Sequence, residues 1–356
     1  MHIEAGEPED QFDLFGVPAN AASAQPAEAR KPPKPRGVLP APLQPELEAL
    51  AKRLPDAIHL GTSTWSFPGW RGIVYGDEYS NTKLSRDGLS AYGAHPLLKS
   101  VSIDRSFYAP LSLAEYARYA SQVPAHFRFI VKAPASVTDA FIRGERGTPD
   151  AENPAFLNAQ IAIDEFVKPC IGGLGAKAGA LVFQFSPLPE AMIVDPASFI
   201  ERLSAFLQAL PPLEGESCYA VEIRDAVMLT PRFIRALREA NVRYCIGVHA
   251  RMPDVRRQAK ALALLDEEGM GPFIARWSLH SGFRYEQAKA KYEPFDKIVD
   301  EDRGTREALA ELAARYAIAG QPVVIAANNK AEGSAPLTCF ELARGIAEEC
   351  ERARSD

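Results

Sequence analysis

The stretch Tyr219-Ala220-Val221-Glu222-Ile223-Arg224 alternates apolar and polar side chains and carries a carboxylate and a guanidinium near its end. Successive side chains of a strand point to opposite faces, so Val221 and Ile223 share one face while Glu222 and Arg224 share the other. An apolar face toward helices and a charged face toward the interior indicates a strand of a closed barrel, with the charges at its mouth.

Runs of the same kind recur along the chain and alternate with segments of helical spacing. The strand candidates are His59-Leu60, Val101-Ile103, Phe129-Val131, Leu181-Phe185, Ala220-Ile223, Tyr244-Val248, Phe273-Trp277 and Val323-Ala327. Eight strands alternating with helices over about 300 residues predict an α/β fold, a (β/α)8 barrel of the TIM type. The alternative is an open doubly wound sheet, but the stretch after the first strand, "LGTSTWSFPGW" (60–70), lacks the GxGxxG phosphate fingerprint.

Four positions carry signals for the start of a helix. Ser112 to Glu115 and Thr338 to Glu341 have the spacing of capping boxes. Asp195 and Thr230 each precede a proline, which favours a cap residue followed by a first-turn proline. We therefore expect helices to begin at these four places.

The composition divides the chain into a tail and one large domain. Residues 1–45 are rich in proline and alanine and predict a disordered tail, and residues 46–356 predict the barrel domain. The net charge of -6 argues against a generally cationic nucleic-acid surface, although a local basic cleft stays open.

Cysteine usage and hydropathy bear on the compartment. The five cysteines form no CxxC pair, which indicates reduced thiols rather than a disulfide framework or a zinc site. No apolar run reaches the ~20 residues of a membrane helix. The acidic N-terminus has no apolar h-region, so we expect no secretory signal, no membrane partner and a cytoplasmic protein.

Polar residues follow the strand runs at the ends where a barrel of this type forms its active site. Those expected to face inward are Asp104, Lys132, Gln184, Glu222, Arg224, His249, Arg276 and Asn328. We expect catalytic roles for Glu222, Asp104, Lys132 and His249. The expected substrate-binding residues are Trp65, Tyr108, Gln184, Arg224, Arg276, Asn328 and Asn329.

Two interpretations of these inward-facing polar residues stay open. In the first, the arginines bind a phosphate or carboxylate and a nearby glutamate or histidine transfers a proton. In the second, the charges only neutralise one another and no turnover occurs. Asp104, Glu222 and His249 could also ligate a metal, but HxH and HExxH spacings are absent and cations are adjacent, so we expect no metal. The sequence specifies no cofactor.

Two further segments near the mouth also have two interpretations each. The cluster Trp65, Phe67, Trp70 and Tyr75 is either a packed floor or a wall that stacks on a ring-shaped ligand. Residues 328–336 carry Gly and Ser before a helix and form either an anion-accepting helix start or an ordinary turn.

Several stretches resemble the family called domain of unknown function 72, also termed YecE-like. They are "GTSTWSFPGWRG" (61–72), "VSIDRSFYAPL" (101–111), "FRFIVKAP" (127–134), "LVFQFSPLP" (181–189), "VEIRD" (221–225) and "NNKAEGSAPLT" (328–338). The resemblance spans about residues 57–350 and implies a TIM-type barrel without an established reaction. Ser102 and Asp104 stand where the family often has Glu and Asn, and Ser278 stands where it often has His. The long stretch between Ser278 and Glu307 suggests a lid or a subfamily insertion.

The tail contains a short apolar cluster, Gln11-Phe12-Asp13-Leu14-Phe15. It resembles the motif by which bacterial proteins bind the replication sliding clamp, with Leu14 and Phe15 in an apolar groove and Gln11 fixing the register. Three functions follow as hypotheses. They are a clamp-tethered enzyme acting on DNA or nucleotides by phosphoester or base processing, an enzyme for a phosphorylated or carboxylated metabolite, and a non-catalytic nucleic-acid adaptor.

Overall fold

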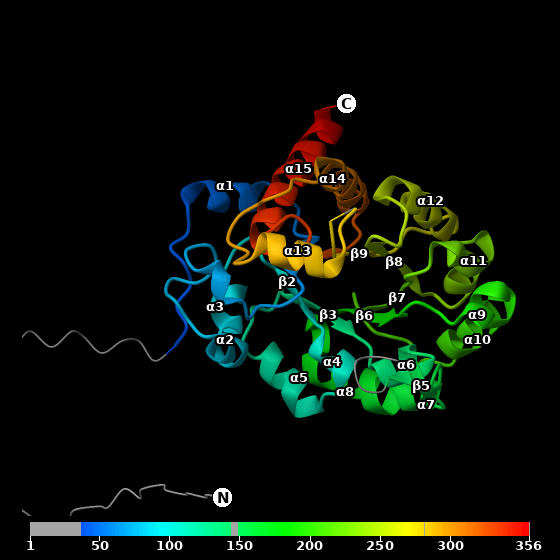
Figure 1. Ribbon diagram of the computed structural model, residues 1–356. Helices are drawn as coiled ribbons and strands as arrows, with labels where there is room; N and C mark the ends of the chain where they lie inside the picture. The colour runs from blue at the N-terminus through cyan, green and yellow to red at the C-terminus, as the bar shows by residue number, and fades with distance from the viewer. Residues whose placement is uncertain (1–36, 144–148, 281, 356) are drawn as a thin grey trace, which may run out of the picture. The chain divides into compact units, whose positions relative to one another are not determined.

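Eight parallel strands close into a barrel in this computed structural model, which describes residues 37–143, 149–280 and 282–355 (Figure 1). The strands are β1 (Ile58–Thr62), β2 (Ser100–Ile103), β3 (Arg128–Lys132), β6 (Ala178–Gln184), β7 (Cys218–Glu222), β8 (Arg243–Val248), β9 (Phe273–Trp277) and β10 (Val323–Ala327). Their order around the barrel is β1-β10-β9-β8-β7-β6-β3-β2. The TIM-type barrel predicted from the eight runs is confirmed.

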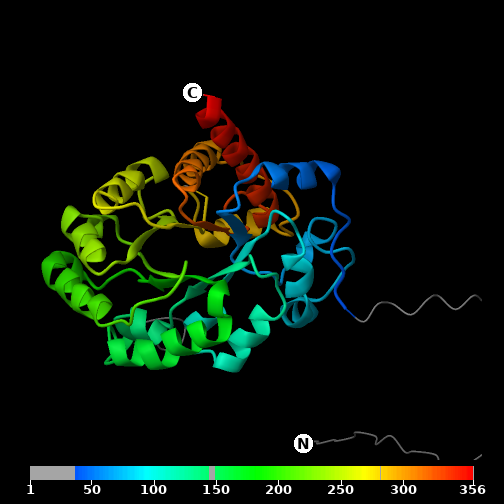
Figure 2. The same cartoon turned by 180° about the vertical axis from the view of Figure 1, so that it is seen from behind.

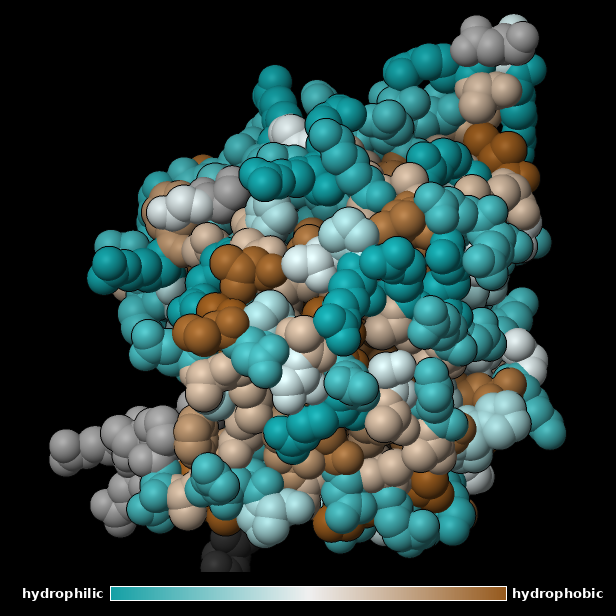
Figure 3. Space-filling view, turned by 90° about the vertical axis from the view of Figure 1, so that its right-hand side faces the viewer, coloured by the Kyte–Doolittle hydropathy of each residue, from teal (hydrophilic) through white to brown (hydrophobic). Residues whose placement is uncertain are grey.

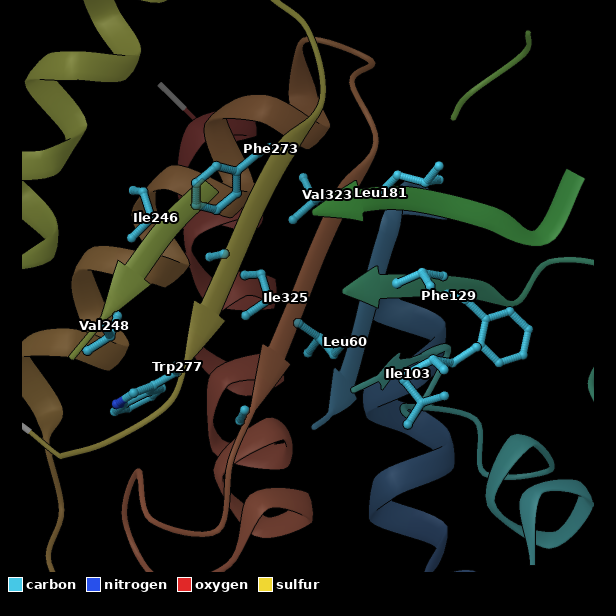
Figure 4. Packing of buried hydrophobic residues seen from close by; sticks show 14 of the residues in the cluster. Leu60, Ile103, Phe129, Leu181, Ile246, Val248, Phe273, Trp277, Val323 and Ile325 are labelled. Atoms are coloured by element: carbon cyan, nitrogen blue, oxygen red, sulfur yellow. The ribbon is translucent and has the colours of Figure 1, made fainter. Parts of the chain in front are cut away.

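Two apolar layers confirm the alternation expected for the strands. Side chains such as Leu60, Phe129 and Ile325 point from the strands toward the helices, where they join the large core (Figure 4). The opposite strand faces form a separate small cluster inside the barrel, made of Ile130, Ala180, Val182, Ala220, Cys245, Ile274, Val324 and Ala326. Glu222 follows Ala220 on the inward face of β7, so the charged residues lie one layer above this small apolar cluster.

The helices surround the barrel, as the front and back views show (Figures 1 and 2). They are α1 (Pro45–Arg53), α2 (Asn81–Asp87), α3 (Leu89–Gly93), α4 (Arg105–Tyr108), α5 (Leu113–Ala120), α6 (Ala135–Thr138), α7 (Ala159–Ala162), α8 (Lys168–Leu174), α9 (Glu190–Val194), α10 (Pro196–Gln208), α11 (Pro231–Glu239), α12 (Val255–Leu265), α13 (Tyr285–Tyr292), α14 (Arg303–Ile318) and α15 (Ala335–Ser355). Short helical turns are η1 (Pro68–Trp70), η3 (Ile163–Val167), η4 (Gly175–Lys177) and η5 (Ala226–Met228). None of the described helices is long and apolar enough to span a bilayer.

Three of the four predicted helix starts are confirmed. Ser112 caps α5 in a complete capping box, and Asp195 and Thr230 accept backbone N–H bonds at the starts of α10 and α11. The start predicted at Thr338 is wrong, because α15 begins three residues earlier, at Ala335. The side chain of a loop residue, Asn329, accepts the Ala335 N–H bond at 2.9 Å and allows this earlier start.

Two segments lie outside the regular alternation. The strands β4 (Phe141–Arg143) and β5 (Pro149–Glu152) form an antiparallel pair after β3. Residues 37–44 precede α1, and the Ala41 N–H donates to the Val74 carbonyl at 2.9 Å. The described chain thus already bonds to the domain before residue 45, where we placed the end of the tail. The motif at residues 11–15 lies outside the described residues.

The outer surfaces of the helices are mainly hydrophilic. On the face that carries α9 to α12, hydrophobic residues occur only in small separate groups (Figure 3). The buried side of α11 explains this distribution, since Phe233, Ile234 and Leu237 all point into the core. The polar residues that matter for function therefore have to be sought at the barrel ends.

Candidate functional site

Glu222 lies at the centre of a buried ion cluster at the C-terminal end of β7. Its side chain is fully buried, and its two oxygens contact different arginines. Oε2 accepts a hydrogen bond from Arg276 Nη1 at 2.7 Å, and Oε1 lies 2.6 Å from Arg224 Nη2. Burial opposes ionisation of Glu222, but these two arginines outweigh it and hold its pKa below the ordinary value.

Arg276, at the end of β9, joins three of the predicted residues. Its Nη2 donates to both oxygens of Asp104, at 3.0 and 2.9 Å, and its Nη1 donates to Gln184 Oε1 at 3.1 Å. Ser102 Oγ in turn donates to Asp104 Oδ1 at 2.6 Å. Burial alone would lower the pKa of Arg276, but Asp104 and Glu222 raise it, so this guanidinium is a fixed charge.

Arg224 is only partly satisfied by its neighbours. Its Nη2 also contacts Gln184 Oε1 and Ser278 Oγ, each at 3.3 Å. Its Nη1 is buried and has no hydrogen-bond partner among the described residues. A buried N–H group without a partner is costly, so this nitrogen is a donor available to a ligand.

Gly247 on β8 makes room for this cluster. A Cβ at this position would lie 3.2 Å from Glu222 Oε1 and 3.5 Å from Arg224 Nη1. The contact to Glu222 is tighter than ordinary van der Waals packing, so a side chain here would displace the ion pair. The glycine therefore leaves the inner wall of the barrel open for the charged residues.

Lys132, at the end of β3, is the cation of the cluster without a carboxylate partner. Its Nζ lies 3.4 Å from the centroid of the Phe107 ring, and no ion pair or hydrogen bond joins it to another described residue. Burial, reinforced by Arg276, lowers the pKa of Lys132 to about 8, although the nearby carboxylates oppose the shift. A fraction of this amine is therefore neutral near neutral pH.

His249 follows β8 at the edge of the cluster and is half-buried. Burial, together with Arg224, lowers its pKa to about 4, although Glu222 opposes the shift. Its Nδ1 accepts the Arg251 N–H at 3.3 Å. The imidazole is consequently neutral at neutral pH and can accept a proton rather than supply a charge.

Four of the predicted binding residues have other partners or are exposed, and no hydrogen bond or ion pair among the described residues joins them to the cluster. Asn328 Nδ2 donates to Ser63 Oγ at 2.7 Å, and Tyr108 is 84% exposed. Trp65 is buried and packs edge-on against Tyr119, with ring centroids 5.2 Å apart. Asn329 is engaged in the fold, because its Oδ1 accepts from Ala335 N and from Trp70 Nε1 at 3.1 Å.

The loop before α15 is occupied by the protein's own groups. Besides Asn329, the carboxylate of Glu332 is fully buried there and accepts the Asp302 N–H at 2.7 Å. Burial raises the pKa of Glu332, while the Arg306 ion pair at 3.0 Å acts in the opposite direction. This loop therefore supplies a carboxylate of its own, which contacts Asp302 and Arg306.

Residues 282–302, which we call the lid segment, pack on the loops after β1 and β10. Phe295 packs edge-on against Phe67, with ring centroids 5.1 Å apart, and Lys330 Nζ lies 4.1 Å from the centroid of the Tyr285 ring. In Figure 1 the helix of this segment, α13 in yellow, is drawn beside β9. The predicted long insertion thus reaches the same end of the barrel as the ion cluster.

Three contributors were not among the predicted site residues. Ser278 comes two positions after Arg276 and therefore points to the same side of the strand. The alternation of side chains could have identified it as a site residue. Phe107 could have been chosen in place of its exposed neighbour Tyr108, but only the contact with Lys132 distinguishes them. Gly247 has no side chain, so a search for chemical groups could not find it.

The described residues include no group of three or more His, Cys, Asp and Glu side chains placed to hold a metal ion. Asp104 and Glu222 are instead paired with arginines. The cluster contains two carboxylates and the three cations Lys132, Arg224 and Arg276, so positive charge is in excess while Lys132 is protonated.

The closed parallel barrel and the ionisable cluster at the C-terminal strand ends define a TIM-type barrel protein with a polar site at its mouth. The chain belongs to the family described as "Protein of unknown function DUF72", which matches residues 59–355. None of the curated proteins matches the sequence.

Solved structures of the same family share the fold. A DUF72 family protein from Enterococcus faecalis V583 is 16% identical with a TM-score of 0.54, over 81% of this chain and 94% of that one. A DUF72 family protein from Thermotoga maritima MSB8 is 16% identical with a TM-score of 0.53, over 82% of this chain and 99% of that one. At this identity the similarity concerns the fold alone.

Proposed function

We propose that the protein is an enzyme acting on a small metabolite that carries a carboxylate or phosphate group, bound at the C-terminal mouth of the barrel. The observation that carries the proposal is the pair of unpartnered cationic groups, Arg224 Nη1 and Lys132 Nζ, in an otherwise paired cluster. An incoming anion would satisfy both, and such charge-assisted hydrogen bonds are among the stronger ones.

The neighbouring groups supply the rest of an active site. His249 and the neutral fraction of Lys132 can accept protons, because their pKa values of about 4 and about 8 leave them uncharged at least in part. Glu222, by contrast, is held by two arginines, and its role is to position them. The lid segment favours a small ligand over a duplex, since it occupies the loops after β1 and β10.

Calorimetric titration with oxalate and with inorganic phosphate tests the proposal. We expect both anions to bind the wild-type protein, and binding to weaken at least tenfold in Lys132→Gln and in Arg224→Gln. Lys168→Gln is the matched control, because Lys168 is an exposed lysine of α8 that is paired with Asp164. Equal binding in all variants, or none in the wild type, would reject the mouth as an anion site.

A second candidate is a DNA- or nucleotide-directed enzyme recruited by the sliding clamp. The observation that favours it is the sequence of residues 11–15, which lies outside the described residues. A nucleotide phosphate would use the same two cationic groups. Titration with a short single-stranded DNA separates the candidates, since a site for small metabolites should bind oxalate but not the oligonucleotide.

A further inference from the structure

We propose that Lys132 is a nucleophilic amine that forms an imine with the carbonyl carbon of a small oxo acid or phosphorylated carbonyl compound. The inference deepens the proposed function and rests on it, because the anionic group of the substrate is to be held by Arg224. It names both the reacting atom, Lys132 Nζ, and the chemical class of the substrate.

The position of Lys132 satisfies the first requirement of such a residue, which is an amine freed from ion pairing. Lys132 is 9% exposed, and its Nζ rests on the Phe107 ring instead of a carboxylate. The carboxylates that could have neutralised it are already engaged, Asp104 and Glu222 both by Arg276. An ammonium beside fixed cations loses its proton more easily, which is how a lysine becomes a nucleophile.

The surroundings satisfy the second requirement, which is an anchor for the substrate. Arg224 Nη1 is buried without a hydrogen-bond partner among the described residues, and Gly247 places no side chain beside it, since a Cβ there would lie 3.5 Å from Nη1. A carboxylate on Nη1 would place the adjacent carbonyl at the cluster, whose charged groups Asp104, Glu222 and Arg224 also act on Lys132. Among the described residues the Lys132 amine has no carboxylate partner and Arg224 Nη1 has no acceptor, and one substrate class accounts for both.

The step balances without any further reactant. The lone pair of the neutral amine attacks the carbonyl carbon, and a C–N bond forms. The two protons of the amine end on the carbonyl oxygen, which leaves as water when the C–O bond breaks. The product is a C=N bond to Nζ, and hydrolysis by water reverses the step.

Reductive trapping with glyoxylate tests the inference on the wild-type protein. Glyoxylate is an aldehyde with a carboxylate, and acetaldehyde is the matched probe without charge. In the presence of cyanoborohydride, hydride adds to the imine carbon and leaves a stable secondary amine. Peptide mass spectrometry then compares Lys132 with Lys168, an exposed lysine that serves as the internal reference.

We expect glyoxylate to modify Lys132 at least tenfold faster than Lys168, and acetaldehyde to show no such preference. Arg224→Gln should remove the preference for glyoxylate. Modification of Lys132 no faster than Lys168 would overturn the inference. If oxalate still binds in that case, the proposed function stands and only the imine fails; if oxalate does not bind either, both fail.

Discussion

Glu222 places a negative charge where water does not reach, and its two oxygens bind two different arginines. A buried carboxylate is tolerated only when it is paired, and the same holds for the buried guanidinium groups around it. Asp104 and Ser278 also contact these arginines. Asp104 completes the pairing of Arg276, and Ser278 contacts Arg224. Arg276 thus has two carboxylate partners, and Arg224 has one.

The first prediction concerns the removal of the central charge. Glu222→Gln leaves two buried arginines short of a counterion and should lower the free energy of unfolding by about 3–5 kcal/mol. Asp104→Asn is the control, because its side chain is 36% exposed and solvent can replace it, at a cost of about 1 kcal/mol. Urea unfolding measures both. Equal losses in the two variants would mean that burial is not what makes Glu222 important.

The second prediction concerns pH. The pKa of Glu222 lies below its ordinary value of 4.5, so its stabilising contribution is fully present above that value and is lost as the pH falls through the folded-state pKa. The stability difference between wild type and Glu222→Gln should thus be largest near neutral pH and shrink in acid. Urea unfolding at a series of pH values measures the difference. A difference that stays constant into acid would contradict the depressed pKa.

At the scale of elements, the helix starts show what local sequence can and cannot specify. Ser112, Asp195 and Thr230 cap their helices as predicted, because the capping bond is made within three residues along the chain. Thr338 failed as a cap because Asn329, six residues before Ala335, caps the helix from a folded loop. Only the three-dimensional course of that loop brings the two together.

The lid segment gives the prediction that belongs to this scale. A Cβ on Gly69 would lie 1.9 Å from the Pro294 carbonyl oxygen, so Gly69→Ala must displace the lid segment. We expect a loss of about 1–3 kcal/mol in stability and faster hydrogen exchange in α13. Gly304→Ala is the control, because nothing lies within 4 Å of its added Cβ. Unchanged exchange in the Gly69 variant would show that the lid segment is not held by this contact.

For the whole molecule, the alternation of side chains along the strands was enough to predict most of the fold and part of the candidate site. Alternation along eight runs was enough to predict the closed barrel and to bring Asp104, Lys132, Gln184, Glu222, Arg224 and Arg276 to one end. Which residues of the ion cluster pair with one another could not be predicted from the sequence, because pairing depends on distances between strands that are far apart in the chain. Lys132 is an example, because no feature of the neighbouring sequence indicates that its amine forms no ion pair with a carboxylate of the cluster.

A large surface cleft lies at the other end of the barrel. It measures 870 Å³ and includes residues 215–219, 238–243 and 268–272 in its wall. These residues precede or begin strands β7, β8 and β9, the end that stabilises barrels of this type, while catalysis occurs at the opposite end. The cleft therefore lies at the opposite end of the barrel from the ion cluster around Glu222.

The last prediction tests whether the whole chain is tethered by its tail. Leu14 and Phe15 are the expected anchors in the clamp groove, and burying each is worth about 1.5–3 kcal/mol. A short motif of micromolar affinity binds with about 8 kcal/mol in total, so Leu14→Ala with Phe15→Ala should make clamp binding undetectable.

A peptide of residues 6–20 should bind the purified clamp of the host without the barrel, because the motif supplies all the contacts. The control is the thermal midpoint of the full chain, which the double substitution should leave unchanged. If the midpoint falls instead, the segment packs on its own domain. If the peptide fails to bind at high micromolar concentration, the chain is not tethered by this motif. The proposal of a DNA substrate would then depend on the barrel mouth alone, where the proposed donors Arg224 and Lys132 have the chemistry to bind a phosphate as well as a carboxylate.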